Sequence, residues 1–557
     1  MKYLFCKLTF FILFLTTNVF AQTKTTNIEI YSKVWGFMKY HHPTVAGGTI
    51  NWDSVYIAHI NKVMEAKNTV ILNNEITEMI NATGPVKAID PVKIPDDLFT
   101  DNHDLKWLNT PVLTLQNRKK LLLIYNNRNQ GNNVFIKPGY DKVAYSGEKQ
   151  YQSMVFPNQN YRLLFLARFW NIINYFDPYK YAIGEDWDNV LVKFIPKIIN
   201  ANNTQRYYKI LLQLAVSLHD GHAQLELPGS ETPINELVFG KYTAPVYVTI
   251  INDTVIVRKT ANDSLCAQAN IKAGDLILSV NNIPVIKKIA QDKPYVSASN
   301  SAAQNEYLSR VLLNTIDVSQ KLKIKRGRKV FTAIVKNIPM SEKKWVDINN
   351  YTANQTGYKI IGNSIVYGYA MQVWKGNMDT IKSLIKTHKA VIFDGRNYQN
   401  NGDIFYSLFD IFLPAPKIIN WSTGVMPANP GYFEWKPSGK IGRVNNAVYS
   451  GKVVLLVDER AQSQGEYTAM ALQTIPNAVT VGSTTAGADG VKTYIPMGGK
   501  LTLSYSGYGV YYPDKTPTQR IGVKIDISVK KTVKAVVKNE DEILDKALNY
   551  LKSKGVD

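Results

Sequence analysis

Hydrophobic residues in the C-terminal third of the chain follow strand-like and helix-like patterns in turn. The run VVLLV at residues 453–457 is apolar on both faces, which is typical of a parallel strand covered by helices. Asp458 ends this run, and a helical periodicity resumes at Glu466 and continues through Leu472. Similar runs alternate from Tyr358 onward, so this part is predicted to be an α/β layer with a largely parallel sheet.

A polar turn between that strand and that helix contains one serine, Ser463. Ser463 and Gln464 fall where the first free backbone N–H groups of the helix point outward. Such groups can stabilise a developing oxyanion. The serine is therefore either an ordinary helix N-cap or a nucleophile, and this segment alone leaves both interpretations open.

An internal repeat occupies the N-terminal half of the chain. Four positions recur with the same spacings, namely Trp35, Pro43, Trp52 and Asp53 in the first unit and Trp170, Pro178, Trp187 and Asp188 in the second. Each unit is predicted to form two short helices joined by a turn that contains the proline. The stretch 86–142 between the units reads as strands and predicts a small β-rich insert.

From about residue 246 the pattern changes to short strands. In IKAGDLILSVNNIPV, residues 271–285, a tight turn at Gly274 precedes a strand in which Leu276, Leu278 and Val280 are predicted to face inward. This segment resembles one found in PDZ domains. The resemblance implies a β-domain that binds a peptide C-terminus as an added strand, and a β-domain that only packs against its neighbours is the alternative.

Composition and charge narrow the function classes. The 557 residues are 45% hydrophobic and 20% charged, which is typical of a globular chain of three or four domains. The formal net charge of +21 would favour acidic envelope surfaces. The lysines are dispersed, however, and no basic helix or aromatic-basic module stands out, so we expect a solvated surface and no nucleic-acid binding.

The first 21 residues predict a secretory signal, because lysines precede an apolar stretch that ends in a small residue, Ala21. We expect the mature chain to begin at Gln22 and to lie in the periplasm or cell envelope, with no stable membrane span. Cys6 falls inside the signal, so Cys266 is left as a lone, buried thiol.

A PDZ-like segment followed by an α/β layer with a serine before an Ala-rich helix resembles the C-terminal processing (tail-specific) serine peptidases. The resemblance covers roughly residue 150 to the C-terminus. The sequence AQSQGE at residues 461–466 occupies the position of their "SASxSE"-like turn, which places Ser463 as the nucleophile. The resemblance also implies a ClpP/crotonase-like α/β core.

The general base differs between two branches of that family. The best-known branch uses a lysine about two dozen residues after the serine, where this chain has Ala488 or Asp489, and Lys492 is a fallback. The branch that resembles the tricorn core uses a histidine far upstream.

The segment SLHDGHAQL at residues 217–225 fits that histidine motif and makes His222 the expected base. An imidazole accepts a serine proton readily, because its pKa lies near 7. His219 is the rival, and Asp220 could either orient the imidazole or cap the turn.

The tricorn branch also uses an acidic residue shortly before a "GVxPD" segment. Gln519 or Thr518 takes its place here, and Lys524 stands where many relatives have glutamate. Gln519 could form a hydrogen bond with the serine or histidine, but it cannot stabilise an imidazolium by charge. A catalytically silent binding or scaffold protein is therefore the alternative to an active peptidase.

The oxyanion donors are expected to be the backbone amides of Gln464 and of Gly402, in a loop that resembles "DLRxNxGG". Asn400 and Asn401 are alternatives to Gly402. No cofactor and no metal are expected, since the His41-His42 pair has no matched carboxylate or thiol cluster.

The sequence thus predicts a secreted serine endopeptidase of multidomain α/β fold that acts on envelope or extracellular polypeptides and captures a substrate tail with its PDZ domain. The substrate, the oligomeric state and the role of the first repeat unit stay open. The expected parts are a signal peptide (1–21), an N-terminal domain with the first repeat unit (22–145), a helical domain with the second (146–240), a PDZ-like domain (241–340) and an α/β peptidase core (341–557).

Overall fold

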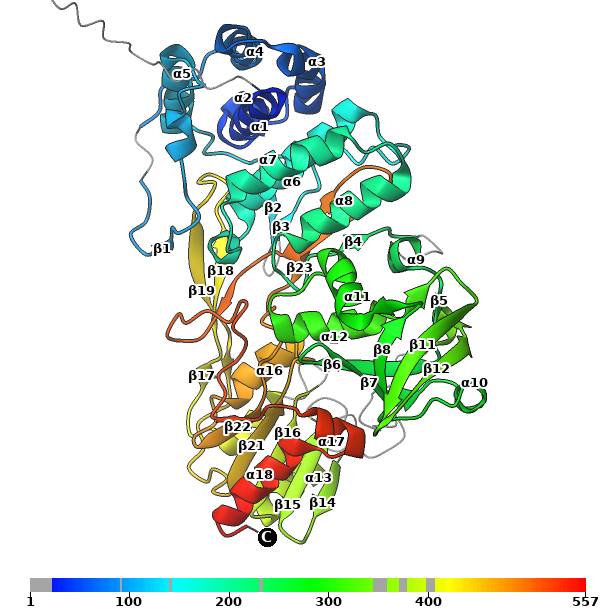
Figure 1. Ribbon diagram of the computed structural model, residues 1–557. Coiled ribbons are helices and arrows are strands. Elements are labelled where there is room, and N and C mark those ends of the chain that lie inside the picture. The colour runs from blue at the N-terminus through cyan, green and yellow to red at the C-terminus, as the bar shows by residue number, and fades with distance from the viewer. Residues whose placement is uncertain are drawn as a thin grey trace, which may run out of the picture.

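A computed structural model describes residues 23–90, 93–139, 143–229, 234–343, 358–369, 378–396 and 406–556. The expected signal segment, Asn400, Asn401 and Gly402 lie outside these ranges. In the described ranges, none of the helices is both long enough and apolar enough to cross a bilayer. Figure 1 shows a helical part in blue and cyan, a green β-sheet beside it, and an α/β layer in yellow to red.

Helices dominate the N-terminal part, where the two repeat units pack against each other. They are α1 (Lys24–His41), α2 (Pro43–Ala46), α3 (Trp52–Glu65), α4 (Thr69–Asn81), α5 (Leu115–Asn126), α6 (Gln159–Phe176), α7 (Trp187–Ile199) and α8 (Thr204–Val216). Trp35 Nε1 donates to Trp52 O at 3.0 Å, and Trp52 Nε1 donates back to Trp35 O at 2.9 Å. Trp170 and Trp187 make the same reciprocal pair at 2.8 and 3.0 Å.

The prediction of a β-rich insert at residues 86–142 is wrong for its central segment, which forms helix α5. The Thr114 side chain caps α5 by accepting from Asn117 N. Leu121 and Ile124, three residues apart, are buried on one face, while neighbouring leucines stay exposed. The apolar run therefore follows a helical stripe, and only short strands remain, at β1 (Leu98–Phe99) and β2 (Lys137–Pro138).

The green part is a mostly antiparallel sheet with its own core. Its strands follow the order β12-β11-β8-β7-β6, with bounds β6 (Val246–Ile251), β7 (Thr254–Thr260), β8 (Leu276–Val280), β11 (Ser319–Arg326) and β12 (Lys329–Lys336). The inward pattern predicted for β8 holds for Val280, which is buried, but not for Leu276 and Leu278. Ile277 is buried, whereas Leu276 and Leu278 are half-buried, because β8 is central and both of its faces meet other elements. Cys266 is a buried free thiol. The PDZ likeness itself stays a prediction.

The α/β layer contains a six-stranded sheet in the order β14-β15-β16-β21-β22-β26, parallel from β15 onward. The bounds are β14 (Tyr358–Ile361), β15 (Ile365–Tyr369), β16 (Ala390–Asp394), β21 (Lys452–Val457), β22 (Ala478–Gly482) and β26 (Ile527–Ser528). On β21, Val453 and Leu455 pack with α13 (Met378–Thr387) and α16 (Gln464–Leu472). Val454 and Leu456 pack with α18 (Glu542–Ser553), so the strand is covered on both faces as predicted.

A hairpin from the C-terminal part reaches into the helical part. Its strands β23 (Lys492–Pro496) and β24 (Thr502–Ser506) form a sheet with β4 (Leu225–Glu226) in the order β23-β24-β4. Ile495, Leu503 and Tyr505 belong to the same hydrophobic core as the Trp units. The hairpin thus joins two parts that are far apart in sequence.

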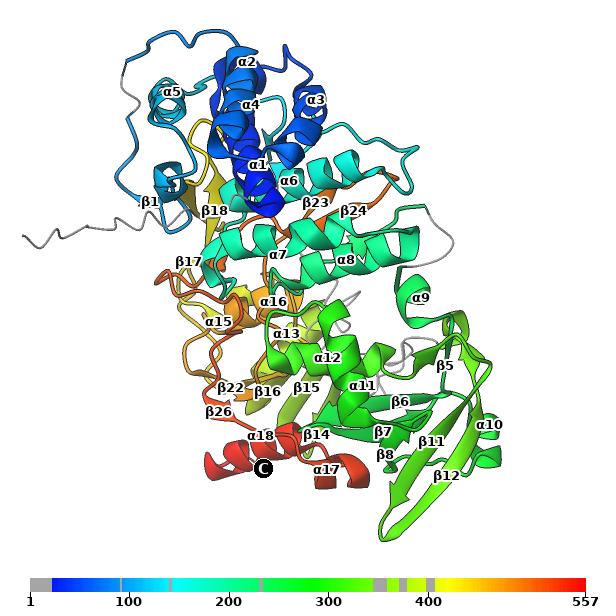
Figure 2. The ribbon, with the colours of Figure 1, turned by 45° about the horizontal axis from the view of Figure 1, so that its top comes forward.

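Short elements complete the structure around these parts. They are β3 (Val143–Ala144), β5 (Tyr242–Thr243), β9 (Ile283–Pro284), β10 (Asn314–Thr315), β13 (Ile338–Pro339), β17 (Lys417–Ile418), β18 (Trp421–Val425), β19 (Phe433–Pro437), β20 (Lys440–Ile441), β25 (Val510–Tyr511), α9 (Ile234–Phe239), α10 (Asp263–Gln268), α11 (Val285–Asp292), α12 (Ser301–Val311), α15 (Phe409–Phe412) and α17 (Val533–Lys538). Among them, α12 packs against β6 and faces the start of α16 (Figure 2).

Candidate active site

Ser463 lies between β21 and α16 in a backbone conformation that few residues other than glycine adopt. Its φ is 54° and its ψ is −119°. A serine held with positive φ between a strand and a helix has the geometry of a nucleophile elbow, which presents Oγ at the end of the sheet. The side chain makes no capping hydrogen bond to α16. Its Oγ donates only a long bond, 3.5 Å, to Gly490 O. The hydroxyl is therefore not used as an ordinary N-cap.

Glu466, in the first turn of α16, holds the loop that surrounds Ser463. Its buried carboxylate accepts from Thr485 Oγ1 at 2.5 Å, Gly487 N at 2.8 Å and Ala488 N at 2.9 Å. Ala488 O in turn accepts from Ser463 N at 3.0 Å. Burial raises the pKa of Glu466 to about 7, although these hydrogen bonds oppose the shift. The motif AQSQGE at residues 461–466 indicated an acidic residue at position 466, but it did not indicate that this residue holds the loop around Ser463.

His222 is buried, and its ring is held on one side by a hydroxyl and a carboxylate. His222 Nδ1 lies 2.9 Å from Ser506 Oγ, which donates to Asp220 Oδ1 at 3.0 Å. Since that hydroxyl donates to the carboxylate, it accepts from Nδ1–H, and this assigns the tautomer with Nε2 unprotonated. Asp220 also accepts from Ser506 N at 2.7 Å and from His222 N at 2.9 Å. Asp220 therefore both caps the turn and orients the ring through Ser506.

The electrostatic surroundings of His222 keep its imidazole neutral. Burial holds its pKa below the ordinary value of 6.5, the negative charge of Asp220 opposes this, and the cation of Lys492 lowers the pKa further. Lys492 Nζ is itself bound to Gln224 Oε1 at 2.6 Å and to Glu226 Oε1 at 2.9 Å. A neutral imidazole is the form that can accept a proton.

The loop before His222 lies against the segments that flank Ser463. A methyl group added at Gly221 would lie 3.0 Å from Ala488 Cβ and 3.3 Å from Gln462 Nε2. Among the described side chains, His222 and Ser463 share no hydrogen bond. The structure thus brings the two predicted segments side by side, without a hydrogen bond between the His222 ring and the Ser463 hydroxyl.

The other predicted residues are placed less directly. Gln519 is buried, and its Oε1 has no hydrogen-bond partner within the described residues. Its neighbour Arg520 donates its N–H to Gly487 O at 2.8 Å, which places Gln519 beside the loop held by Glu466. Gln464 begins α16, and its side chain donates to Tyr406 Oη at 3.3 Å.

The alternatives to these residues are placed elsewhere. The Thr518 hydroxyl donates to Val510 O at 3.0 Å, and Lys524 Nζ pairs with Asp514 at 3.1 Å. Burial lowers the pKa of His219, and Arg520 acts in the same direction. No described hydrogen bond joins His219 to the groups around Ser463. Gly402, Asn400 and Asn401 lie outside the described residues.

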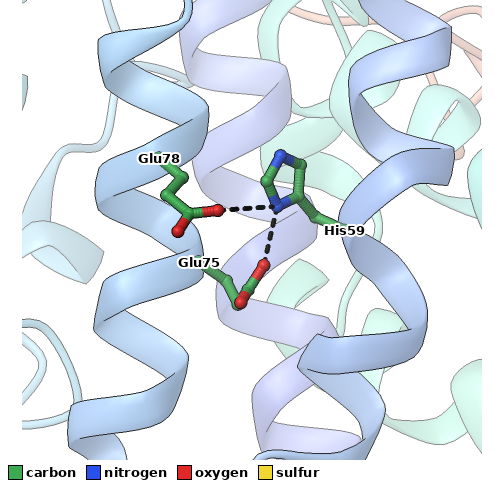
Figure 3. Close-up of side chains that lie close together, drawn as sticks. All are labelled: His59, Glu75 and Glu78. Carbon is green, nitrogen blue, oxygen red and sulfur yellow. Dashed lines mark hydrogen bonds and ion pairs between the residues drawn. The ribbon is translucent and has the colours of Figure 1, made fainter.

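Figure 3 shows a separate cluster of possible metal ligands on α3 and α4. His59 Nδ1 lies 2.7 Å from Glu75 Oε2 and 3.8 Å from Glu78 Oε2. Lys62 Nζ also approaches Glu75, at 3.7 Å. These contacts account for the cluster as an ion-paired link between two helices, and Glu78 is mostly exposed. The sequence prediction that no metal binds concerned a different pair, His41 and His42, and this cluster does not test it. His41 Nδ1 forms a hydrogen bond with Phe37 O at 2.9 Å.

The chain is similar to known peptidases in part of its sequence and in its fold. Residues 371–529 match peptidase family S41. The structure of mature CPAF complexed with lactacystin aligns with a TM-score of 0.54 and 16% identity, over 71% of this chain and 98% of that chain. At that identity the likeness shows a shared fold. No curated protein sequence matches the chain significantly.

Two further structures align more weakly. The photosystem II D1 C-terminal processing protease has a TM-score of 0.37 and 14% identity, over 68% of this chain and 96% of that chain. A crystal structure of a putative peptidase from Parabacteroides merdae has a TM-score of 0.40 and 16% identity, over 71% and 96%. Both TM-scores are low, so these two structures resemble the chain only weakly.

Proposed function

We propose that the chain is a serine endopeptidase with Ser463 as its nucleophile, because residues 371–529 match peptidase family S41. The observation that carries the proposal is the backbone of Ser463, at φ 54° and ψ −119°, with an Oγ that does not cap the helix. A strained conformation of this kind persists only where the surrounding structure enforces it, and it clusters at active sites.

In the proposed mechanism, His222 Nε2 accepts the proton of Ser463 Oγ as the oxygen attacks the scissile carbonyl, and later returns it to the leaving amine. Ser506 and Asp220 fix the ring through Nδ1. Asp220 then stabilises the imidazolium indirectly, because the neutral Ser506 hydroxyl lies between the carboxylate and the ring. The mechanism requires Nε2 and Oγ to come within hydrogen-bonding distance when substrate binds.

The oxyanion of the tetrahedral intermediate requires donors of its own. We assign one to the backbone N–H of Gln464 at the start of α16, where the helix dipole is also favourable. Gly402 is the proposed second donor. Gln519, with its buried Oε1, is proposed as a polar residue that accepts a hydrogen bond in the closed site.

The location and the capture of substrate belong to the same proposal. Residues 1–21 have the pattern of a secretory signal, which supports a location in the periplasm or cell envelope and action on polypeptides there. The sheet β12-β11-β8-β7-β6 has two edges at which an extended tail can add as a strand, in the manner of a PDZ domain. Its helix α12 adjoins both β6 and the nucleophile turn.

Hydrolysis of a panel of unfolded polypeptides by wild-type protein and by Ser463→Ala tests the proposal. We expect Ser463→Ala to lose at least about 10³-fold in turnover, as removal of a serine nucleophile does elsewhere, with an unchanged circular dichroism spectrum. Ser553→Ala, an exposed serine on α18, is the matched control and should retain full activity. Undiminished turnover by Ser463→Ala would overturn the assignment.

A catalytically silent protein that binds peptides is the second candidate. It is favoured by the glutamine at 519 in place of the family's acid, and by the missing bond between His222 and Ser463. A serine-directed fluorophosphonate discriminates between the two. Covalent labelling that Ser463→Ala abolishes supports the enzyme, whereas peptide binding without labelling or turnover supports the silent form.

A further inference from the structure

A pocket of about 440 Å³ opens next to the proposed nucleophile turn. It is bounded by α8, β4, α9, the loop before α12, and α12 itself, which lie together in Figure 1. This volume falls within the range of pockets that hold small ligands or side chains. The described parts of the helical domain, the β-domain and the α/β layer all contribute to its wall.

The pocket surface is only slightly more apolar than polar, and several apolar side chains line it. They include Leu212, Leu225, Leu227, Ile234, Phe239 and Val311. The charged residues on the wall already have partners, since Glu226 pairs with Lys492 at 2.9 Å and Arg310 with Glu306 at 3.1 Å. An additional charge placed inside would lack a counter-ion and would lose hydration, so the pocket favours an uncharged group.

The pocket is lined by the sequence neighbours of both proposed catalytic residues. Ala223, which follows His222, and Gln462, which precedes Ser463, both line it. The Tyr307 hydroxyl on α12 hydrogen-bonds to Gln462 Oε1, so this end of the wall is fixed to the β-domain. A chain whose carbonyl lies at Ser463 Oγ can therefore place a nearby side chain inside the pocket.

Strand β4 forms one wall of the pocket and is the last strand of its sheet. It pairs with β24 through Leu225 with Leu503 and Glu226 with Thr502. No described strand pairs with its other edge. The backbone N–H and C=O groups of such an edge can bind an extended peptide as an additional strand.

We propose that this pocket is a specificity subsite that receives a large apolar side chain of an extended polypeptide substrate, whose main chain adds to the open edge of β4. The inference rests on the proposed peptidase function and names the substrate feature that the site selects. Leu, Phe and Met side chains fit its apolar wall, and Asp, Glu, Lys and Arg do not.

Cleavage-site profiling tests the apolar preference. A proteome-derived peptide library is digested with wild-type protein, Leu227→Trp and Leu227→Ala, and the cut positions are read by mass spectrometry. Leu227 is half-buried on the pocket wall, so tryptophan fills the space and alanine enlarges it. For wild type and Leu227→Ala, we expect large apolar residues to be enriched at one fixed position near the cut.

For Leu227→Trp, kcat/KM for a peptide with leucine or phenylalanine at that position should fall about tenfold or more, while the matched alanine peptide changes by less than about twofold. Ser297→Phe narrows the same pocket from another wall and should shift the preference in the same direction, which covers the case in which Leu227→Trp does not fold.

N-methylation of the substrate tests the strand pairing. Only alternate amides of an added strand point toward β4, so N-methyl groups should block cleavage with a period of two residues beyond the scissile bond. An unchanged preference in both pocket variants, or an N-methyl profile without period two, overturns the subsite. A wild-type protein that cleaves no peptide and takes no fluorophosphonate instead overturns the proposed function, so the two failures are distinguishable.

Discussion

Ser506 links the imidazole of His222 to the carboxylate of Asp220. Its hydroxyl accepts from Nδ1 at 2.9 Å and donates to the carboxylate at 3.0 Å, while its own N–H is held by Asp220 at 2.7 Å. A neutral hydroxyl in this position fixes the ring and its tautomer but supplies no charge. Ser506 is therefore a positioning residue for the proposed base.

Replacing Ser506 by alanine should lower kcat by about 10- to 100-fold, because the ring loses its orienting partner, while KM changes little. Ser506→Thr keeps a hydroxyl and should recover most of the activity. Steady-state kinetics on one peptide substrate check this, and circular dichroism serves as the folding control. An equal loss in Ser506→Ala and Ser506→Thr would indicate a packing role instead.

The proposed base also predicts a pH profile. His222 must be neutral to accept a proton, and its pKa is held below 6.5, first by burial and also by Lys492. Activity should therefore persist below pH 6.5 and disappear as pH falls through the pKa of the folded state. Lys492→Gln removes a nearby cation, so the acid limb of kcat/KM should move to higher pH.

Lys500 is an exposed lysine on the same hairpin, so Lys500→Gln is the control for Lys492→Gln. It should leave the acid limb of kcat/KM at the same pH as in the wild type. A loss of activity at every pH in Lys492→Gln would contradict this assignment and would make Lys492 the proton acceptor, as in the lysine branch of the family.

Glu466 predicts a pH-dependent stability. Its pKa in the folded protein is about 7, above the ordinary value of 4.5, so its contribution to folding is fully present below pH 4.5 and is lost as pH rises to about 7. Glu466→Gln does not titrate. The Tm of the wild type minus the Tm of Glu466→Gln should therefore decrease between pH 4.5 and 7 and remain constant above pH 7. Scanning calorimetry can measure this difference. A difference that is constant from pH 4 to 8 would refute the shift.

The two Trp units pair with each other through equivalent positions. Lys33 and Arg168 each precede the first tryptophan of a unit by two residues. Lys33 Nζ contacts Asp188 at 2.9 Å in the other unit, and Arg168 Nη2 contacts Asp53 at 2.8 Å. The helices of the two units are thus joined by two ion pairs at equivalent positions, each from one unit to the other, as in a local two-fold arrangement. The first unit therefore has a role in supporting the second.

The two crossed pairs differ in burial, and their mutants should differ accordingly. Asp53 and Arg168 are buried, so Asp53→Asn leaves a buried cation less compensated and should cost about 3–5 kcal/mol. Asp188 has a side chain that is 42% exposed, and Asp188→Asn should cost about 1 kcal/mol or less. Urea denaturation followed by tryptophan fluorescence compares the two, and equal costs would contradict the burial argument.

Some patterns within one segment were predicted correctly, whereas most contacts between distant segments were not. The strand at 453–457 could be predicted because it is apolar on both faces, and it forms β21. The run that became α5 was misread, since four apolar residues in a row fit either a strand or a helix. Ser506 could not be found, because its role exists only once a hairpin meets Asp220, 286 residues away.

The resemblance to C-terminal processing peptidases is confirmed at the level of family S41 by the match over residues 371–529. That match covers the nucleophile turn but not His222, which lies upstream of it. The roles of Ser463, His222, Gln519, Gln464 and Gly402 remain predictions, as do the bounds of the five expected parts. The active site as proposed therefore depends on how separate parts of the chain assemble.

The hairpin β23–β24 is the connection on which this assembly depends. It begins in the segment that matches peptidase family S41, contributes Ser506, and buries Ile495, Leu503 and Tyr505 in the core of the Trp units. Strand β21, which leads to the proposed nucleophile Ser463, packs in other cores. Regions that share a core tend to open together, so the hairpin should behave as part of the helical domain although it belongs to the peptidase segment.

Hydrogen exchange measured by mass spectrometry at increasing urea concentration can test this division. We expect peptides from β23–β24 to lose protection together with α6, and β21 to open separately. Leu503→Ala removes a buried side chain and should cost about 2–5 kcal/mol, lowering protection in α6 and the hairpin but not in β21. It should also lower kcat, since His222 and Ser506 are held by this hairpin while Ser463 is not. If the hairpin instead opened with β21 and left α6 protected, the two proposed catalytic residues would be joined by some other contact.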